Sequence, residues 1–118
     1  MQHSIIAEKS LAFAIRVVKL YKLLAENKRE YVLSKQLMRS GTSIGANVRE
    51  ALQAQSSKDF ISKMSIALKE AAETEYWLVL LKETDYLSEK EYMSIAADCS
   101  ELNKILIAIV KSTKENNN

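Results

Sequence analysis

Proline is absent from this chain, and its only two glycines, Gly41 and Gly45, lie four residues apart in the stretch Arg39–Ala51. A glycine inside a helix costs about 1 kcal/mol relative to alanine, so this spacing needs a structural reason. The surrounding apolar residues nevertheless keep the spacing of one helical face, at Leu33, Leu37, Ile44, Val48 and Ala51. Two interpretations stay open: a helix that ends in a turn before a second short helix, or one continuous helix whose small residues let another backbone approach closely.

Length and composition favour a single all-α domain over residues 1–118. Alanine, leucine, isoleucine, lysine and glutamate are abundant, aromatic residues make up 7%, and turn signals for strands are few. The single cysteine, Cys99, excludes an internal disulfide framework and a multi-cysteine zinc site, and we expect it to be a small buried hydrophobe. No run of about 18 uncharged apolar residues is present, and the first twenty residues do not have the pattern of a signal peptide. We therefore expect a soluble, cytoplasmic protein without membrane contact.

Periodicity and capping patterns predict four helices, at about residues 5–27, 31–55, 58–84 and 89–112. Ser56 and Ser57 with Asp59 predict a cap for the third helix, and Ser88 with Glu91 predicts a capping box for the fourth.

The second predicted helix carries a basic stripe opposite its core face. When Leu37 and Ile44 set the core side, a step of about 100° per residue places Lys35, Arg39 and Arg49 within a narrow arc on the other side. Residues 1–55 carry nine Lys/Arg against four Asp/Glu, although the formal net charge of the whole chain is only +2. The stripe is a candidate site for RNA or DNA backbone, and a plain solvated face is the alternative.

One carboxylate, Glu75, falls within the predicted core stripe of the third helix. A buried charge without a partner is too costly to keep, so Glu75 needs one. If the second and third helices form an antiparallel hairpin, Glu75 lies level with Arg39 and Ser40, and Asn47 also lies at the edge of the core. We therefore predict a structural polar contact among Arg39, Ser40, Asn47 and Glu75.

Two further features are candidates for an interface. Leu11, Ile15 and Val18 form a second apolar stripe on the first helix, wider than a surface helix of a small bundle requires. Trp77 lies on a mixed apolar and acidic face of the third helix. Each is either a contact with another subunit or a broad seam inside the bundle.

The residues of an enzyme or a metal site are missing from this sequence. A bundle metal site of the ferritin type needs Glu-x-x-His pairs, and the only histidine is His3, in a terminal segment. Ser40 and Ser43 have no histidine base, and the glycines lack the neighbouring lysine of a phosphate-binding loop. The sequence predicts no catalysis, no cofactor and no metal.

Two segments carry a resemblance to a known family. The first is the run 36–51, QLMRSGTSIGANVREA, and the second comprises 58–60, KDF, followed by 66–71, IALKEA, and 73–78, ETEYWL. At this separation they resemble the bacterial four-helix-bundle family that is associated with intervening sequences of 23S ribosomal RNA genes. That family includes the accessory variability determinant of diversity-generating retroelements.

The resemblance implies an up-and-down antiparallel four-helix bundle that assembles as a ring-like homopentamer. In the retroelement branch it also implies a basic surface that engages nucleic acid and a partner reverse transcriptase. Five copies of Lys35, Arg39 and Arg49 would multiply the modest charge of one chain. A structural protein–protein scaffold that binds no nucleic acid is the alternative function.

Overall fold

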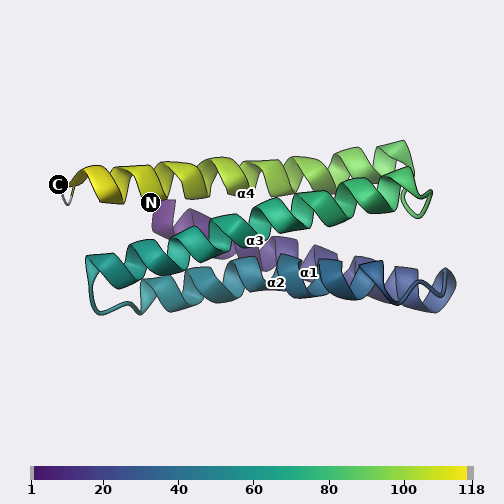
Figure 1. Ribbon diagram of the computed structural model, residues 1–118, viewed down its shortest axis with the longest axis horizontal. Helices are drawn as coiled ribbons and strands as arrows, with labels where there is room; N and C mark the ends of the chain where they lie inside the picture. Colours follow the sequence, from purple (N-terminus) through teal and green to yellow (C-terminus); the bar gives the residue numbers. More distant parts are fainter. Residues whose placement is uncertain (1, 117–118) are drawn as a thin grey trace.

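The computed structural model describes residues 2–116, and within this range all regular structure is helical. The helices are α1 (Gln2–Asn27), α2 (Leu33–Leu52), α3 (Ser57–Glu83) and α4 (Glu89–Asn116). Successive helices run in opposite directions, which makes an up-and-down bundle with extents of 48 × 21 × 20 Å (Figure 1). A single helix of 28 residues spans about 42 Å at 1.5 Å per residue, so the longest extent is only slightly more than one helix length.

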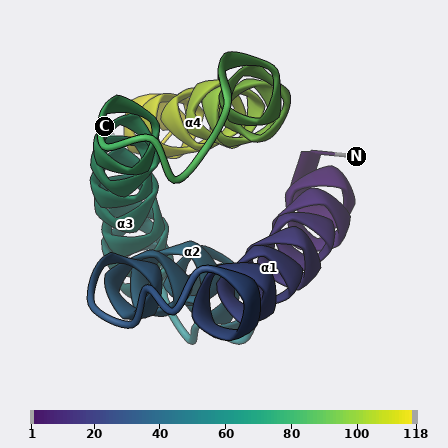
Figure 2. The ribbon, with the colours of Figure 1, turned by 90° about the vertical axis from the view of Figure 1, so that its right-hand side faces the viewer.

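Each helix packs mainly against its neighbours in the sequence, so α1 lies on α2, α2 on α3 and α3 on α4. Figure 2 shows the four helices around the sides of an open square, in which α1 and α4 form the least extensive seam. This seam is the only one that joins helices distant in the sequence.

The predicted apolar stripes supply the core. Within the described part of the chain the side chains at most 4% exposed include Phe13, Val17, Leu24, Leu37, Ile44, Val48, Ala51, Met64, Ala67, Leu78, Ile95, Cys99, Leu102 and Leu106. None of the four helices has an apolar stretch long enough to cross a membrane.

The predicted caps of α3 and α4 are confirmed. Ser56 Oγ accepts the backbone N–H of Asp59 at 3.1 Å. At the start of α4 the Glu91 carboxylate accepts the N–H of Ser88 at 2.8 Å, and Ser88 Oγ accepts the N–H of Glu91 at 3.1 Å. These bonds satisfy N–H groups that have no partner inside a helix.

The start of α2 depends on a carboxylate that the sequence patterns did not single out. Glu30, which is 8% exposed, accepts the backbone N–H groups of Val32, Leu33 and Ser34 at 3.1, 3.0 and 2.7 Å. Desolvation by burial raises the pKa of Glu30, but these hydrogen bonds together outweigh it and hold the pKa below its usual value. Because Glu30 caps the helix from outside, α2 begins at Leu33, two residues later than expected.

Candidate functional site

The two glycines lie on the side of α2 that faces α1. A Cβ added to Gly41 would lie 2.9 Å from both γ carbons of Val17, and one added to Gly45 would lie 3.4 Å from the backbone oxygen of Ser10. The helix is continuous through both positions, so the interpretation with a turn is wrong. The small residues allow α1 to approach closely, which is what the second interpretation required.

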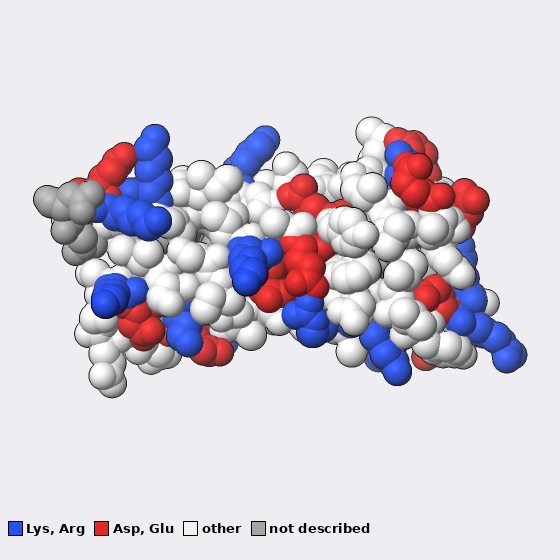
Figure 3. Space-filling view, in the orientation of Figure 1, with Lys and Arg blue, Asp and Glu red and all other residues white. Residues whose placement is uncertain are grey.

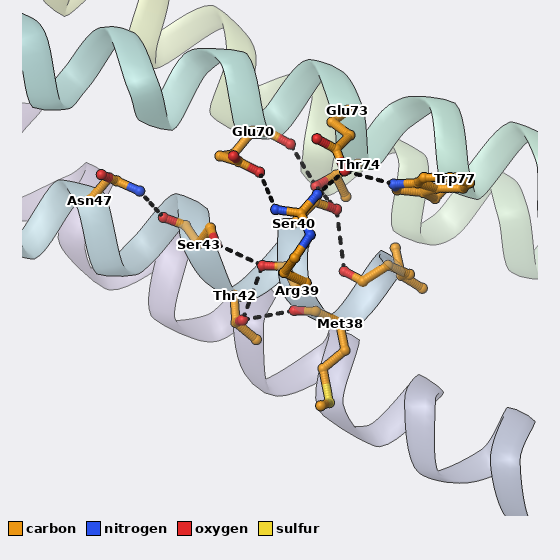
Figure 4. Close-up of polar contacts among 11 residues, drawn as sticks. Met38, Arg39, Ser40, Thr42, Ser43, Asn47, Glu70, Glu73, Thr74 and Trp77 are labelled. Carbon is orange, nitrogen blue, oxygen red and sulfur yellow. Dashed lines mark hydrogen bonds and ion pairs between the residues drawn. The ribbon is translucent and has the colours of Figure 1, made fainter. Parts of the chain in front are cut away.

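The polar contact between α2 and α3 inside the bundle is made by two hydroxyls. Ser40 and Thr74 are both fully buried, and their oxygens form a hydrogen bond of 2.9 Å (Figure 4). Thr74 also donates to the backbone oxygen of Glu70 at 2.8 Å, and Ser40 Oγ lies 3.4 Å from the backbone oxygen of Leu37. Both buried hydroxyls are therefore satisfied without a charged group.

The prediction that Glu75 occupies the core and meets Ser40 is wrong. Glu75 is exposed and pairs with the side-chain amide of Asn103 on α4. Its predicted position along the helix axis was correct to within one residue, because its neighbour Thr74 meets Ser40. The error is rotational: one residue step turns about 100° around a helix, which moves Glu75 from the α2 flank of α3 to the α4 flank.

Arg39 belongs to a cluster of charged groups rather than to a free basic stripe. Its guanidinium forms ion pairs with Glu70, at 3.2 Å, and with Glu73 of α3 (Figure 4). Trp77 Nε1 donates to the same Glu73 carboxylate at 3.0 Å. The Trp77 hydrogen bond, with a further contribution from Arg39, lowers the pKa of Glu73, and the Glu73 hydrogen bond raises the pKa of Arg39. Arg39 is thus engaged within the chain.

Asn47 makes no contact with Glu75. Its amide donates to the backbone oxygen of Ser43 at 2.8 Å, one turn earlier in α2. Thr42 and Ser43 bond back in the same way to the oxygens of Met38 and Arg39, each at 2.7 Å. The hydrogen-bonding groups of these side chains are therefore satisfied by backbone oxygens of their own helix and not by a neighbouring helix. Ser, Thr and Asn commonly form such local hydrogen bonds.

Lys35 and Arg49 are the members of the predicted basic stripe that have no carboxylate partner within the described residues. Both are exposed, and with 14 residue steps between them they lie about 21 Å apart along α2. On the face of the molecule that Figure 3 shows, cations and carboxylates are interspersed rather than separated into one basic strip. Of the three cations in the predicted basic stripe, only Lys35 and Arg49 are therefore without a carboxylate partner in the described part of the chain, and they lie far apart.

The predicted apolar interface on α1 lies beside Arg49. Leu11 and Ile15 are each 48% exposed, while Val18 is half-buried. Leu11 and Arg49 line the same shallow groove between α1 and α2, together with Ala7, Ser10, Ala14, Thr42, Gly45 and Ala46. The structure thus brings one predicted interface residue and one predicted nucleic-acid residue onto one surface.

Trp77, the other interface candidate, is half-buried and packs against the core of its own chain. Its indole N–H is used by Glu73, and its ring meets the ring of Tyr76 edge to face, with centroids 5.1 Å apart. The hydrogen bond of Trp77 therefore holds the Glu73 carboxylate that Arg39 contacts.

Sequence reasoning missed Thr74, Glu70 and Glu73 as the partners of α2. A signal for Thr74 was present, because it continues the spacing of Ala67, Ala71, Leu78 and Leu81, all of which are buried. A polar residue within such a series is expected to find a partner on the facing helix.

The Ser40–Thr74 bond leads to a testable prediction. Replacing Thr74 with valine keeps the shape but leaves the buried Ser40 hydroxyl with a poor acceptor, so we expect a loss of about 1 to 2 kcal/mol in the free energy of unfolding. The Ser40→Ala/Thr74→Val double variant removes both hydroxyls and should be closer to wild type than the Thr74→Val single variant. Urea unfolding of wild type, the Thr74→Val variant and the double variant measures this, and equal stability of Thr74→Val and wild type would contradict it.

The thiol of Cys99 is buried beside the backbone oxygen of Ala71, 3.5 Å away. Desolvation by burial, with smaller contributions from Glu75 and Asp98, raises its pKa to about 12. The thiol therefore stays protonated at neutral pH and lacks the thiolate that nucleophilic chemistry needs.

The fold and its seams define a class, that of antiparallel four-helix-bundle proteins with a tight α1–α2 pair. The family model described as "23S rRNA-intervening sequence protein" matches residues 2–108. The chain belongs to this family, which confirms the family resemblance that the two sequence segments carry.

A solved structure supports the same assignment. The chain is 58% identical to a protein of unknown function from the S23 ribosomal protein family of Bacteroides thetaiotaomicron VPI-5482, with a TM-score of 0.93. The match covers 94% of this chain and 99% of that one. No match was found among curated proteins.

Proposed function

We propose that this protein is a non-enzymatic accessory protein that assembles with copies of itself and binds the phosphate backbone of RNA or DNA. The observation that carries the proposal is the outer face of the α1–α2 hairpin. There, exposed Leu11 lines a groove with Arg49, which has no carboxylate partner among the described residues, and exposed Ile15 lies one turn of α1 further on.

The apolar part of this face supports self-assembly. Two aliphatic side chains that are each 48% exposed on neighbouring turns of α1 gain stability when another copy covers them. Five copies, the number that the family resemblance implies, would form a ring.

The cations on the α1–α2 hairpin support backbone binding. The packing of Gly41 on Val17 and of Gly45 on Ser10 fixes the register of α1 and α2, so Lys22 and Lys35 lie at the same level along the bundle axis to within about one turn. Both lysines are exposed and have no ion-pair partner among residues 2–116. Assembly repeats Lys22, Lys35 and Arg49 in every copy, so that a modest charge per chain becomes a multivalent one.

Assembly is tested with a Leu11→Glu/Ile15→Glu variant. Carboxylates on the apolar face should give particles of one 13.3 kDa chain by light scattering, while wild type gives a multiple of this mass. A Leu11→Met/Ile15→Met variant keeps the face apolar and should stay assembled. A wild type that is monomeric at micromolar concentration would remove the assembly part of the proposal.

Backbone binding is tested by filter-binding titrations with structured RNA and duplex DNA at about 50 and 200 mM salt. We expect the affinity of wild type to fall steeply with salt and a Lys35→Glu/Arg49→Glu variant to bind at least about tenfold more weakly. Lys104→Glu/Lys111→Glu, on α4, changes the net charge equally and should bind nearly as wild type. The proposal fails if wild type retains neither ligand at low salt, or if both variants lose equal affinity.

A second candidate function is a protein-binding scaffold. The pairing of Arg39 with Glu70 and Glu73 favours it, because two carboxylates of the same chain neutralise one of the three predicted cations. An assembled wild type that binds neither RNA nor DNA in the same titrations would support the scaffold.

A further inference from the structure

A groove lies in the seam between α1 and α4, where the bundle is most open. Its volume is about 410 Å³. Polar bridges between distant parts of the chain lie toward both ends of the groove. At one end Arg16 donates to Asp98 at 2.7 Å and to Ser94 Oγ at 2.9 Å, and toward the other end Lys28 Nζ donates to the backbone oxygen of Tyr86 at 3.1 Å. These bridges hold the two sides of the seam in place.

The apolar part of the groove is formed by Leu20 of α1, Leu87 of the α3–α4 loop and Ile95 of α4. Leu87 and Ile95 are 4% and 3% exposed, so they belong to the packed core and have fixed positions. A ligand seated on them would meet a preformed apolar surface, which is typical of small-molecule sites.

The charged part of the groove carries more cations than carboxylates, with Arg16, Lys19 and Lys90 against Glu91. Lys19 on α1 and Lys90 on α4 line it, both are exposed, and neither has a carboxylate partner within the described chain. One carboxylate, that of Glu91, also lines the groove, and it accepts the N–H of Ser88 at the start of α4. Asp98 is paired with Arg16, so the two free lysines exceed the one remaining carboxylate. An apolar surface between two lysines with no partner complements a ligand that is apolar along its body and anionic at one end.

We propose that this groove binds a small amphiphilic carboxylate, in which an alkyl chain or ring lies on Leu20, Leu87 and Ile95 and the carboxylate lies between Lys19 and Lys90. The volume is within the range of small-molecule sites, about 300 to 1,000 Å³. Its α4 wall, Lys90 to Ile95, spans only about 7.5 Å along the axis, whereas a docked partner helix anchors through residues up to seven positions apart, which span about 10.5 Å. The dimensions therefore favour a small molecule over a protein segment.

The probe is decanoate, titrated into the full chain below its micellar concentration while the methyl resonances of Leu20, Leu87 and Ile95 are followed by NMR. Decanol, which has the same tail without the charge, is the matched ligand. We expect decanoate to shift these methyl resonances and to bind at least about tenfold more tightly than decanol. A Lys19→Gln/Lys90→Gln variant should bind decanoate only as tightly as wild type binds decanol.

A second groove on α4 provides the matched control variant. It is lined by Leu68, Ile107 and Val110 with Lys111 and Lys114, so it also combines apolar side chains with two lysines. Lys111→Gln/Lys114→Gln should bind decanoate as wild type does. The proposal is overturned if decanoate shifts no methyl resonance of the α1–α4 groove, if decanol binds equally well, or if Lys19→Gln/Lys90→Gln binds decanoate like wild type.

Discussion

Gly41→Ala is expected to lower the free energy of unfolding by about 1 to 2 kcal/mol, although alanine is the better helix former. The new Cβ would lie 2.9 Å from both γ carbons of Val17, which is fully buried and β-branched and so has little freedom to turn away. Overpacking of a closed seam costs about 1 to 3 kcal/mol, and the gain in helix propensity, about 1 kcal/mol, offsets only part of it. Thermal unfolding would show a melting temperature lower by several degrees.

The matched control is the same substitution at Gly45. There the nearest atoms, the backbone and side-chain oxygens of Ser10, lie 3.4 Å from the new Cβ, which is an ordinary contact. Gly45→Ala should therefore leave stability unchanged or raise it by up to about 1 kcal/mol. Gly41→Ala should also be less harmful in a Val17→Ala background, because the clashing γ carbons are absent. If both glycine variants are stabilised alike, the contact between Gly41 and Val17 has room for a Cβ, and the prediction is wrong.

Glu30→Gln is expected to lower the free energy of unfolding by about 2 kcal/mol at neutral pH. The carboxylate accepts three backbone N–H groups at the start of α2, and a carboxamide replaces one of its acceptor oxygens with a donor. Hydrogen bonds to a charged acceptor are stronger than those to a neutral one, and the loss of a cap alone costs about 0.5 to 2 kcal/mol.

The pH dependence of this effect follows from the lowered pKa of Glu30. The unfolded chain has the ordinary glutamate pKa of about 4.3, and the folded chain has a lower one, so the unfolded state binds the proton more readily. The extra stability is fully present above the unfolded pKa and is lost as the pH falls through the folded pKa. Urea unfolding at a series of pH values should show the two proteins differing at neutral pH and converging in acid. Glu26→Gln, an exposed site on α1, is the control, and a constant difference down to the lowest pH would contradict the capping role.

The fold was predictable because its signals are local. Apolar spacing located the buried faces, and the Ser88–Glu91 box marked the start of α4 by bonds that span only three residues. The start of α2 was less predictable, because Glu30 acts from outside the helix, and a glutamate ahead of an apolar run does not by itself indicate a cap.

The polar site was only partly predictable, because its geometry depends on which neighbour each side of a helix faces. The predicted α2–α3 register was right to within one residue, but α3 lies between α2 and α4, and its sequence does not say which flank faces which helix. Thr74 and Glu75 differ by one residue, and one meets Ser40 while the other meets Asn103. The same holds for Arg39. Its exposure to solvent was predicted correctly, but its ion pairs with Glu70 and Glu73 depend on how α2 and α3 are placed.

The order of the helices around the bundle also bears on how the chain reaches this structure. Three of the four seams join helices that follow one another, and each forms by closing a short hairpin. Only the α1–α4 seam needs residues far apart in the sequence, such as Arg16 and Ser94, which are 78 positions apart. Chains whose contacts are mostly local fold quickly, since little loop-closure entropy is lost before contacts form. The open seam is therefore also the one whose formation requires the first and last helices of the chain to meet.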